Sequence, residues 1–358
     1  MCSQPVGVPP GSESGGGSGS VQSVIGRICA AQDETTLREG IEQGRQAARA
    51  AVRAGAPATE VAAQWSQLLR AAVAAAVGMT PVDAPWSWFV SGSVARGEAM
   101  VRSDVETLIV LADGTDDDAA GALQARAADV HALLERCGVS ADGNGVLASR
   151  RRFCRTGAAW SDAIARWTAD PREDRGVVMT GVLADSRGVG LVSPAPPETA
   201  PGVADDLLRT QLLRAAAANY PARQYLLQDA TTLRATLPSR LRLLANQPDS
   251  VDIKLAALDP LVKIARWAAL SAGSAALATP ERLDDAVAAN ILEAEDGSSL
   301  RDCFDWLLGF RWSSCIDNDT VALSTLPPRQ RTTLRAVARE VAGISRKLSF
   351  MASASTFR

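Results

Sequence analysis

Apolar residues recur at helical spacing along the first part of the chain. Between residues 21 and 77 they stand three or four positions apart, as at Val61, Trp65 and Leu68, with an interruption at Gly55. This spacing is typical of amphipathic helices that bury one face. The pattern predicts an N-terminal segment of two or more helices.

Two short runs of strand character come next. Residues 86–90 (WSWFV) end two positions before Gly92, and residues 105–112 (VETLIVLA) begin directly after Asp104. β-branched and aromatic residues favour strands. A helical stripe follows over residues 116–137, so strand and helix together predict an α/β unit.

The pattern of apolar residues changes near residue 200. Residues 150–170 have helical spacing, and the apolar run 177–184 (VVMTGVLA) predicts a further strand that ends at Asp185. The proline-rich stretch 193–202 predicts a linker, and nearly everything after it has the pattern of helices. We therefore expect an α+β fold with four parts: a disordered tail (1–20), an N-terminal helical segment (21–80), a central mixed α/β domain (81–200) and a C-terminal helical domain (201–358).

Composition and charge narrow the class of protein. The chain has 358 residues, 47% of them hydrophobic, and a net charge of −3. That balance provides no excess of positive charge for a nucleic-acid partner. The six cysteines are scattered, which argues against a zinc site or a disulfide framework. Residues 1–20 lack the pattern of a signal peptide, and no apolar run reaches the roughly 20 residues of a membrane span, so we expect a cytoplasmic protein without a membrane partner.

The chemistry concentrates around the two strands. Gly92 lets the backbone approach a phosphate closely, and the Ser93 hydroxyl can donate a hydrogen bond to it. Asp104 and Glu106 stand two residues apart, so on a strand their side chains share a face. Two such carboxylates suit Mg²⁺, with Mn²⁺ as the alternative, and the cation would bridge to substrate phosphates. The expected reaction is in-line displacement at a phosphoryl group.

The order of these motifs resembles a known superfamily. Gly-Ser followed by Asp-x-Glu on the next strand is similar to the DNA polymerase beta type nucleotidyltransferases, which implies their mixed sheet with helices. The sequence GSVARGE (92–98) narrows the resemblance to protein-PII uridylyltransferase and to bacterial nucleotidyltransferases that carry a helical substrate-binding C-terminal domain. The stretch VDIKLAALDPLVKIARWAAL (251–270) resembles part of that second domain.

The resemblance also implies roles for individual residues. It makes Asp185, in GVLADSRGVG, the third carboxylate beside Asp104 and Glu106, all three being catalytic and metal-binding. Nucleotide-binding roles fall to the remaining candidate residues, which are Gly92, Ser93, Arg96, Arg187 and Lys254. Arginine and lysine in such positions meet phosphate oxygens as charged donors, although both commonly pair with acidic neighbours instead.

Three hypotheses about function follow. The first is an enzyme that transfers AMP or UMP from a nucleoside triphosphate such as ATP to a protein or small-molecule acceptor. The second is a catalytically weakened nucleotide-binding protein of regulation or signal transduction, because Glu106 stands where close relatives have aspartate. The third is a structural helical scaffold. His131, the only histidine, is expected to be a packing residue, and exposed apolar helices would support a homodimer.

Overall fold

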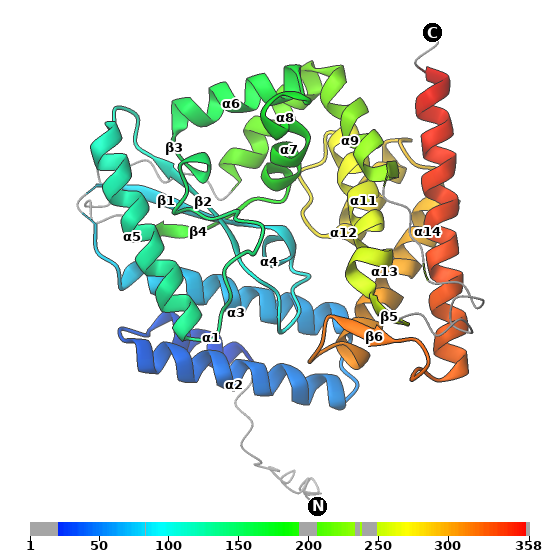
Figure 1. The fold of residues 1–358 in the computed structure, drawn as a ribbon, viewed down its shortest axis with the longest axis horizontal. Coiled ribbons are helices and arrows are strands. Elements are labelled where there is room, and N and C mark those ends of the chain that lie inside the picture. Colours follow the sequence, from blue (N-terminus) through cyan, green and yellow to red (C-terminus); the bar gives the residue numbers. More distant parts are fainter. Residues whose placement is uncertain (1–20, 83, 193–205, 233–236, 238–248, 356–358) are drawn as a thin grey trace, which may run out of the picture.

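The computed structural model describes residues 21–82, 84–192, 206–232, 237 and 249–355. A four-stranded sheet lies between two sets of helices, and a further group of helices stands beside them (Figure 1). This arrangement confirms the predicted α+β class. The predicted tail (1–20) and the predicted linker (193–202) lie outside the described residues.

The first half of the chain supplies the sheet and the helices on both of its faces. Its elements are α1 (Val21–Cys29), α2 (Glu34–Arg53), α3 (Ala58–Gly78), β1 (Trp86–Ser91), α4 (Gly92–Arg96), β2 (Glu106–Leu111), α5 (Asp117–Arg136), a 3₁₀ turn (Arg151–Phe153), β3 (Cys154–Thr156), α6 (Gly157–Ala169), a second 3₁₀ turn (Glu173–Arg175), α7 (Gly176–Ala184), β4 (Arg187–Val192) and α8 (Leu207–Ala218). Side-chain caps begin two of the long helices, because Asp33 accepts a hydrogen bond from the Thr36 amide and Asp116 from the Ala119 amide.

The second half is almost entirely helical. Its elements are α9 (Tyr220–Thr232), β5 (Ser250–Asp252), the π-helix η3 (Lys254–Leu258), α11 (Asp259–Ala272), α12 (Thr279–Ala288), α13 (Ala294–Ser314), β6 (Thr320–Ala322) and α14 (Pro328–Ser355). Figure 1 shows these helices side by side, with β5 and β6 as a small antiparallel pair at one end. The helical character expected for the C-terminal part of the chain is confirmed, and the predicted domain boundary near residue 200 stays a prediction.

The sheet has the strand order β3-β2-β1-β4. β1 runs antiparallel to both β2 and β4, whereas β2 and β3 are parallel. The register pairs Trp86 with Leu111 at one end of β1 and Ser91 with Glu106 at the other. The turn that follows β1 therefore lies beside the first residue of β2.

The alternation of side chains along the strands divides the core into two clusters. Trp88 of β1 and Ile109 of β2 pack with the N-terminal helices, while Phe89 and Leu108 pack with α6, α7 and α8 on the opposite face. Side chains two residues apart share a face, so Glu106 points to the same side as Leu108. The Glu106 side chain thus faces the layer that contains α7.

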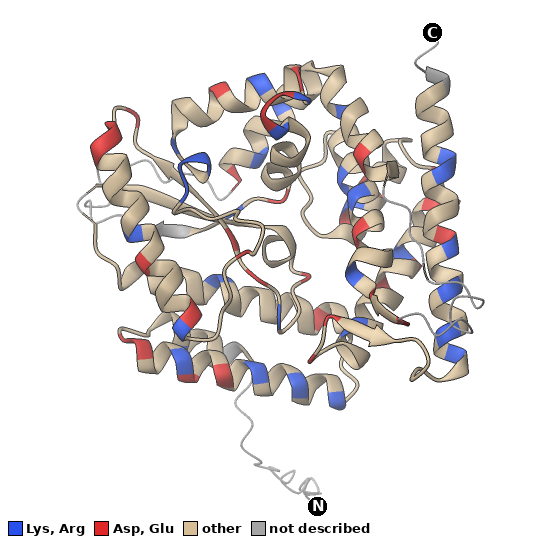
Figure 2. Ribbon diagram, in the orientation of Figure 1, with Lys and Arg blue, Asp and Glu red and all other residues tan. Residues whose placement is uncertain are grey.

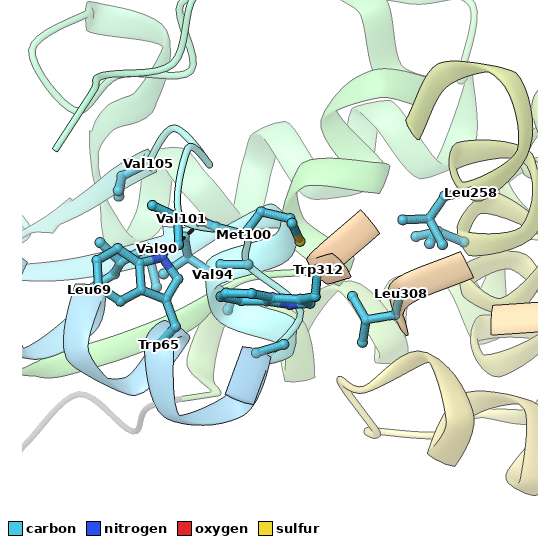
Figure 3. Close-up of a cluster of buried hydrophobic side chains, with 14 of the residues drawn as sticks. Trp65, Leu69, Val90, Val94, Met100, Val101, Val105, Leu258, Leu308 and Trp312 are labelled. Carbon is cyan, nitrogen blue, oxygen red and sulfur yellow. Dashed lines mark hydrogen bonds between the residues drawn. The ribbon is translucent and has the colours of Figure 1, made fainter. Parts of the chain in front are cut away.

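The two halves of the chain share one apolar core. Trp65 and Met100 from the first half belong to the same buried cluster as Leu258, Leu308 and Trp312 from the second (Figure 3). The indole N–H of Trp65 also donates a hydrogen bond to the Met100 carbonyl at 2.8 Å. In the described part of the chain, no helix is long and apolar enough to cross a membrane.

Two predictions about local structure are wrong. The run 177–184 forms the helix α7 instead of a strand, and the strand β4 begins only after Asp185. A short, uniformly apolar run has no periodicity to distinguish the two, and here it is packed between α6, α8 and α9. Within 150–170 the helix begins at Gly157, because residues 154–156 pair with β2 as the strand β3.

Candidate active site

A glycine turn brings the predicted phosphate-binding residues against the predicted metal ligands. Gly92 has φ +64°, in the left-handed region, and begins α4 directly after β1. A Cβ atom added to Gly92 would lie 2.9 Å from a carboxylate oxygen of Glu106. Only glycine therefore satisfies both the backbone conformation and the close approach of this carboxylate.

Asp104 and Glu106 line one cavity together with Gly92 and Ser93. Burial raises the pKa of both carboxyl groups, and the negative charge of Asp142 raises each further. The pKa of Glu106 rises to about 7. For Asp104 the positive charge of Lys254 acts in the opposite direction. The positive charges near Asp104 and Glu106 therefore do not balance the negative charge of the two carboxylates.

Asp142 is a buried carboxylate that the sequence analysis did not assign to the site. A parallel bridge between Val105 and Ala141 brings it beside Asp104. Its own loop holds it, because one carboxylate oxygen accepts a hydrogen bond from the Val146 amide at 2.7 Å. The sequence signal was the turn-rich stretch DGNG that follows Ala141, and only long-range pairing shows where that stretch lies.

Asp185 is surrounded by arginines. Its oxygens accept hydrogen bonds from Arg96, from Arg266 at 2.5 and 3.1 Å, and from Arg282 at 2.7 Å. Burial alone would raise its pKa, but the three guanidinium groups outweigh burial and hold the pKa of this carboxyl well below its usual range. A metal ion at Asp185 would have to displace at least one of them.

This ionic cluster connects the two halves of the chain. Arg96 also donates to Glu98 at 2.7 Å, and Glu98 in turn accepts a hydrogen bond from the backbone N–H of Thr279, at the start of α12. Arg282 of α12 donates to the Ala184 carbonyl as well. Buried charges are tolerated when each is paired and hydrogen-bonded, and every member of this set meets that condition.

The C-terminal half supplies one wall of the cavity. Lys254 of η3 and Lys263 and Arg266 of α11 line it opposite Gly92 and Asp104. Figure 2 shows acidic segments at the centre of the fold, where β2 begins, and basic segments on α11 across from them. Lys263 is paired with Asp229 of α9 at 2.9 Å. Cations on this wall can meet the charge of a triphosphate.

Seven of the eight predicted site residues line this cavity, which has a volume of about 260 Å³. They are Gly92, Ser93, Arg96, Asp104, Glu106, Asp185 and Lys254. Arg187 does not line it, because β4 carries this residue along the sheet, where it pairs with Val90. The cavity also has an apolar side on α7, formed by Val178 and Val182. The roles assigned to all eight residues remain predictions.

The donor set suits a hard cation only in part. Among the residues that the structure describes, no three or more histidine, cysteine or carboxylate side chains are arranged to hold a metal ion. Asp104 and Glu106 are a pair, and Mg²⁺ commonly takes one or two protein carboxylates while water and substrate phosphates complete its shell. The raised pKa values indicate that a divalent cation would relieve repulsion at this pair.

His131 has a structural role, as expected. It is buried on α5, and its Nε2 lies 2.9 Å from the Thr107 hydroxyl. Burial lowers its pKa to about 4. The Thr107 oxygen also accepts a hydrogen bond from the Ala148 amide. A neutral ring packed edge-on against Trp88 is a core residue and no general base.

Comparison with known families places this cavity in context. Residues 42–174 match the model described as "Putative nucleotidyltransferase DUF294", and residues 223–351 match "Putative nucleotidyltransferase substrate binding domain". The first match includes α3, which packs on the sheet, and the second contains Lys254 and Arg266. No curated protein matches the chain. The two matches together cover more than two thirds of the sequence, and they follow one another in the order that the resemblance implied. The chain therefore belongs to this family of putative nucleotidyltransferases with a substrate-binding domain.

Proposed function

We propose that the protein transfers a nucleoside monophosphate, AMP or UMP, from a magnesium-bound nucleoside triphosphate to a hydroxyl group of a protein or small-molecule acceptor. General nucleotidyl transfer is supported by family membership. The observation that carries the finer proposal is the contact between the Gly92 turn and the carboxylate of Glu106, with Asp104 in the same cavity.

The proposed reaction exchanges a phosphoanhydride bond for a phosphoester bond. The acceptor oxygen bonds to the α-phosphorus, the bond from that phosphorus to the bridging oxygen breaks, pyrophosphate leaves, and the hydroxyl proton passes to solvent or a base. Mg²⁺ held by Asp104 and Glu106 would neutralise charge that develops on the phosphate oxygens. Such a displacement depends mainly on positioning and charge stabilisation, which is what fixed side chains can supply.

The protein's own residues divide this work. The Gly92 turn and the Ser93 hydroxyl hold phosphate oxygens from the sheet side. Lys254 and Arg266 approach from the opposite wall as charged donors. Asp185, in this proposal, orients Arg96 and Arg266 through its hydrogen bonds, because a carboxyl group with so low a pKa is a weak base.

The test is transfer of label. The full-length protein is incubated with Mg²⁺, a cell lysate and either ATP or UTP labelled at the α-phosphate. We expect one nucleotide to label a lysate component, and Asp104→Asn to abolish that labelling. The matched control is Asp118→Asn, the same substitution at an exposed position on α5, which should leave labelling intact. Equal labelling by Asp104→Asn would overturn the proposal.

A catalytically weakened nucleotide-binding protein is the second candidate. The observation that favours it is the engagement of Asp185 by three guanidinium groups, which occupy the oxygens a third metal-binding carboxylate would offer. Saturable binding of the nucleotide, with no label transferred under Mg²⁺ or Mn²⁺, would support this reading over the enzyme. A purely structural scaffold predicts no metal-dependent shift of the unfolding temperature by nucleotide.

A further inference from the structure

A second cavity lies beside the loop that carries Asp104. It has a volume of about 250 Å³, and Ser103 lines it, whereas the next residue, Asp104, lines the candidate active site. We propose that this second cavity binds the phosphate group of a small molecule, either inorganic phosphate or a compact phosphate monoester. The inference does not depend on the proposed transfer reaction.

Three arginines surround this cavity. Arg45 and Arg49 stand four residues apart on α2 and therefore share a face of that helix, and Arg102 comes from the loop before β2. Arg45 is held in place by its neighbours, because it donates hydrogen bonds to the Gly138 carbonyl at 2.9 Å and to Glu42 at 2.5 Å. Guanidinium groups match phosphate oxygens in pairs of parallel hydrogen bonds, which makes such a cluster suited to a dianion.

The acidic partners of Arg49 and Arg102 are exposed to solvent. Asp317 pairs with Arg49 at 2.5 Å, and its side chain is 68% exposed. Asp319 reaches Arg102 only at 3.8 Å, and both of these side chains are more than half exposed. Exposed ion pairs contribute little, because water screens them and ordering the side chains costs entropy. A phosphate dianion can therefore replace these carboxylates.

Part of the hydrogen-bonding capacity is unused. Within the described residues, the buried Nε of Arg49 has no hydrogen-bond partner. A buried donor left unsatisfied is unfavourable, and a phosphate oxygen that reached this Nε would remove that cost. The hydroxyl-bearing residues Ser103 and Ser140 also line the cavity and provide neutral donors beside the guanidinium groups.

Size and polarity limit the ligand. The volume is roughly eight times the ~30 Å³ of one water molecule in the liquid, so a phosphate with a small organic group fits and a polynucleotide does not. Val101 offers one apolar contact, and no aromatic side chain lines the cavity within the described residues, so there is no surface on which a base could stack.

The experiment is isothermal titration of the full-length protein with inorganic phosphate and, separately, with glycerol 3-phosphate. EDTA is present in both, so that no cation draws phosphate to Asp104. We expect saturable binding that Arg102→Gln weakens by at least about fivefold, through loss of one charged donor. Asp317→Asn should strengthen binding, because it removes the competing carboxylate. The matched control is Arg126→Gln on α5, an exposed arginine paired with Asp129, which should change nothing.

A further variant separates the two cavities. Lys254→Gln removes a cation from the candidate active site only, so phosphate binding at the second cavity should not change. Tighter binding of glycerol 3-phosphate than of phosphate would identify a monoester as the ligand, and equal or weaker binding would identify phosphate itself. Absence of binding, or binding lost in Lys254→Gln but intact in Arg102→Gln, would overturn the inference, whatever the outcome of the labelling experiment.

Discussion

Replacing Gly92 by alanine tests the geometry of the candidate active site most directly. The backbone at this position has φ +64°, and alanine in the left-handed region costs about 1–2 kcal/mol. The unfolding temperature should fall by a few degrees on this ground alone. That loss reflects the backbone only and would occur at many turns.

The second effect is specific to the site. The added Cβ would lie 2.9–3.0 Å from the carboxylate of Glu106, so these atoms must separate by about 0.5 Å to reach ordinary van der Waals contact. Displacements of about 1 Å at a reacting centre can lower rates by a hundredfold. We therefore expect Gly92→Ala to reduce the rate of nucleotide transfer by about tenfold or more.

A matched control isolates this second effect. Gly55 has φ +82°, and a Cβ added there meets no atom within 4 Å. Gly55→Ala should therefore lower the unfolding temperature comparably and leave transfer unchanged. The assay is the initial rate of label incorporation at saturating nucleotide, measured beside thermal unfolding of both variants.

Shortening the opposing side chain tests the same contact. If the two groups collide, Glu106→Asp should partly relieve the overlap, and the double variant should lose less activity than the two single losses combined. Equal transfer rates in Gly92→Ala and Gly55→Ala, or strict additivity in the double variant, would show that the close approach of Glu106 to the turn has no functional consequence.

Three further predictions concern charge. The pKa of Glu106 is about 7 in the folded protein and 4.5 ordinarily, so its protonation stabilises the metal-free fold below pH 4.5, and this contribution is lost as pH rises through 7. The free energy of unfolding of Glu106→Gln should therefore increase by up to about 3 kcal/mol relative to the native protein between pH 5 and pH 8. Urea unfolding in EDTA measures this difference. Arg282→Ala leaves Asp185 with one buried partner fewer and should cost about 3–5 kcal/mol, whereas Arg301→Ala, at an exposed pair, should cost under about 1 kcal/mol. Lys254→Gln should raise the KM for nucleoside triphosphate about tenfold, and an unchanged KM would remove this residue from the site.

The central strands could be predicted from sequence because their information is local. Residues 86–90 and 105–112 combine β-branched and aromatic side chains with clear boundaries. The first observed strand ends one residue later than predicted, and the second is one residue shorter at each end. That Glu106 shares a face of the sheet with Leu108 also follows from the two-residue period. For the same reason the sequence predicts four residues of the cavity, which are Gly92, Ser93, Asp104 and Glu106.

The remaining features depend on contacts between distant segments. The apolar run 177–184 is helical because neighbouring helices surround it, which its own residues do not encode. Asp142 reaches the site through a bridge to Val105 that no local pattern indicates. The arginines around Asp185 are up to 97 residues away in the sequence. The motif of Asp185 is therefore similar to that of a metal ligand, although its carboxylate forms three ion pairs in the fold.

The hydrogen bond from the Thr279 amide to Glu98 has a consequence for cooperativity. It joins residues 181 positions apart, and it belongs to the same ionic cluster as Arg96 and Arg282. Two family models divide the chain, yet neither half can unfold without leaving buried charges of the other unpaired. Calorimetry should therefore record a single transition, with the van't Hoff enthalpy equal to the calorimetric one. The two modules that the family models separate should therefore unfold together as one cooperative unit.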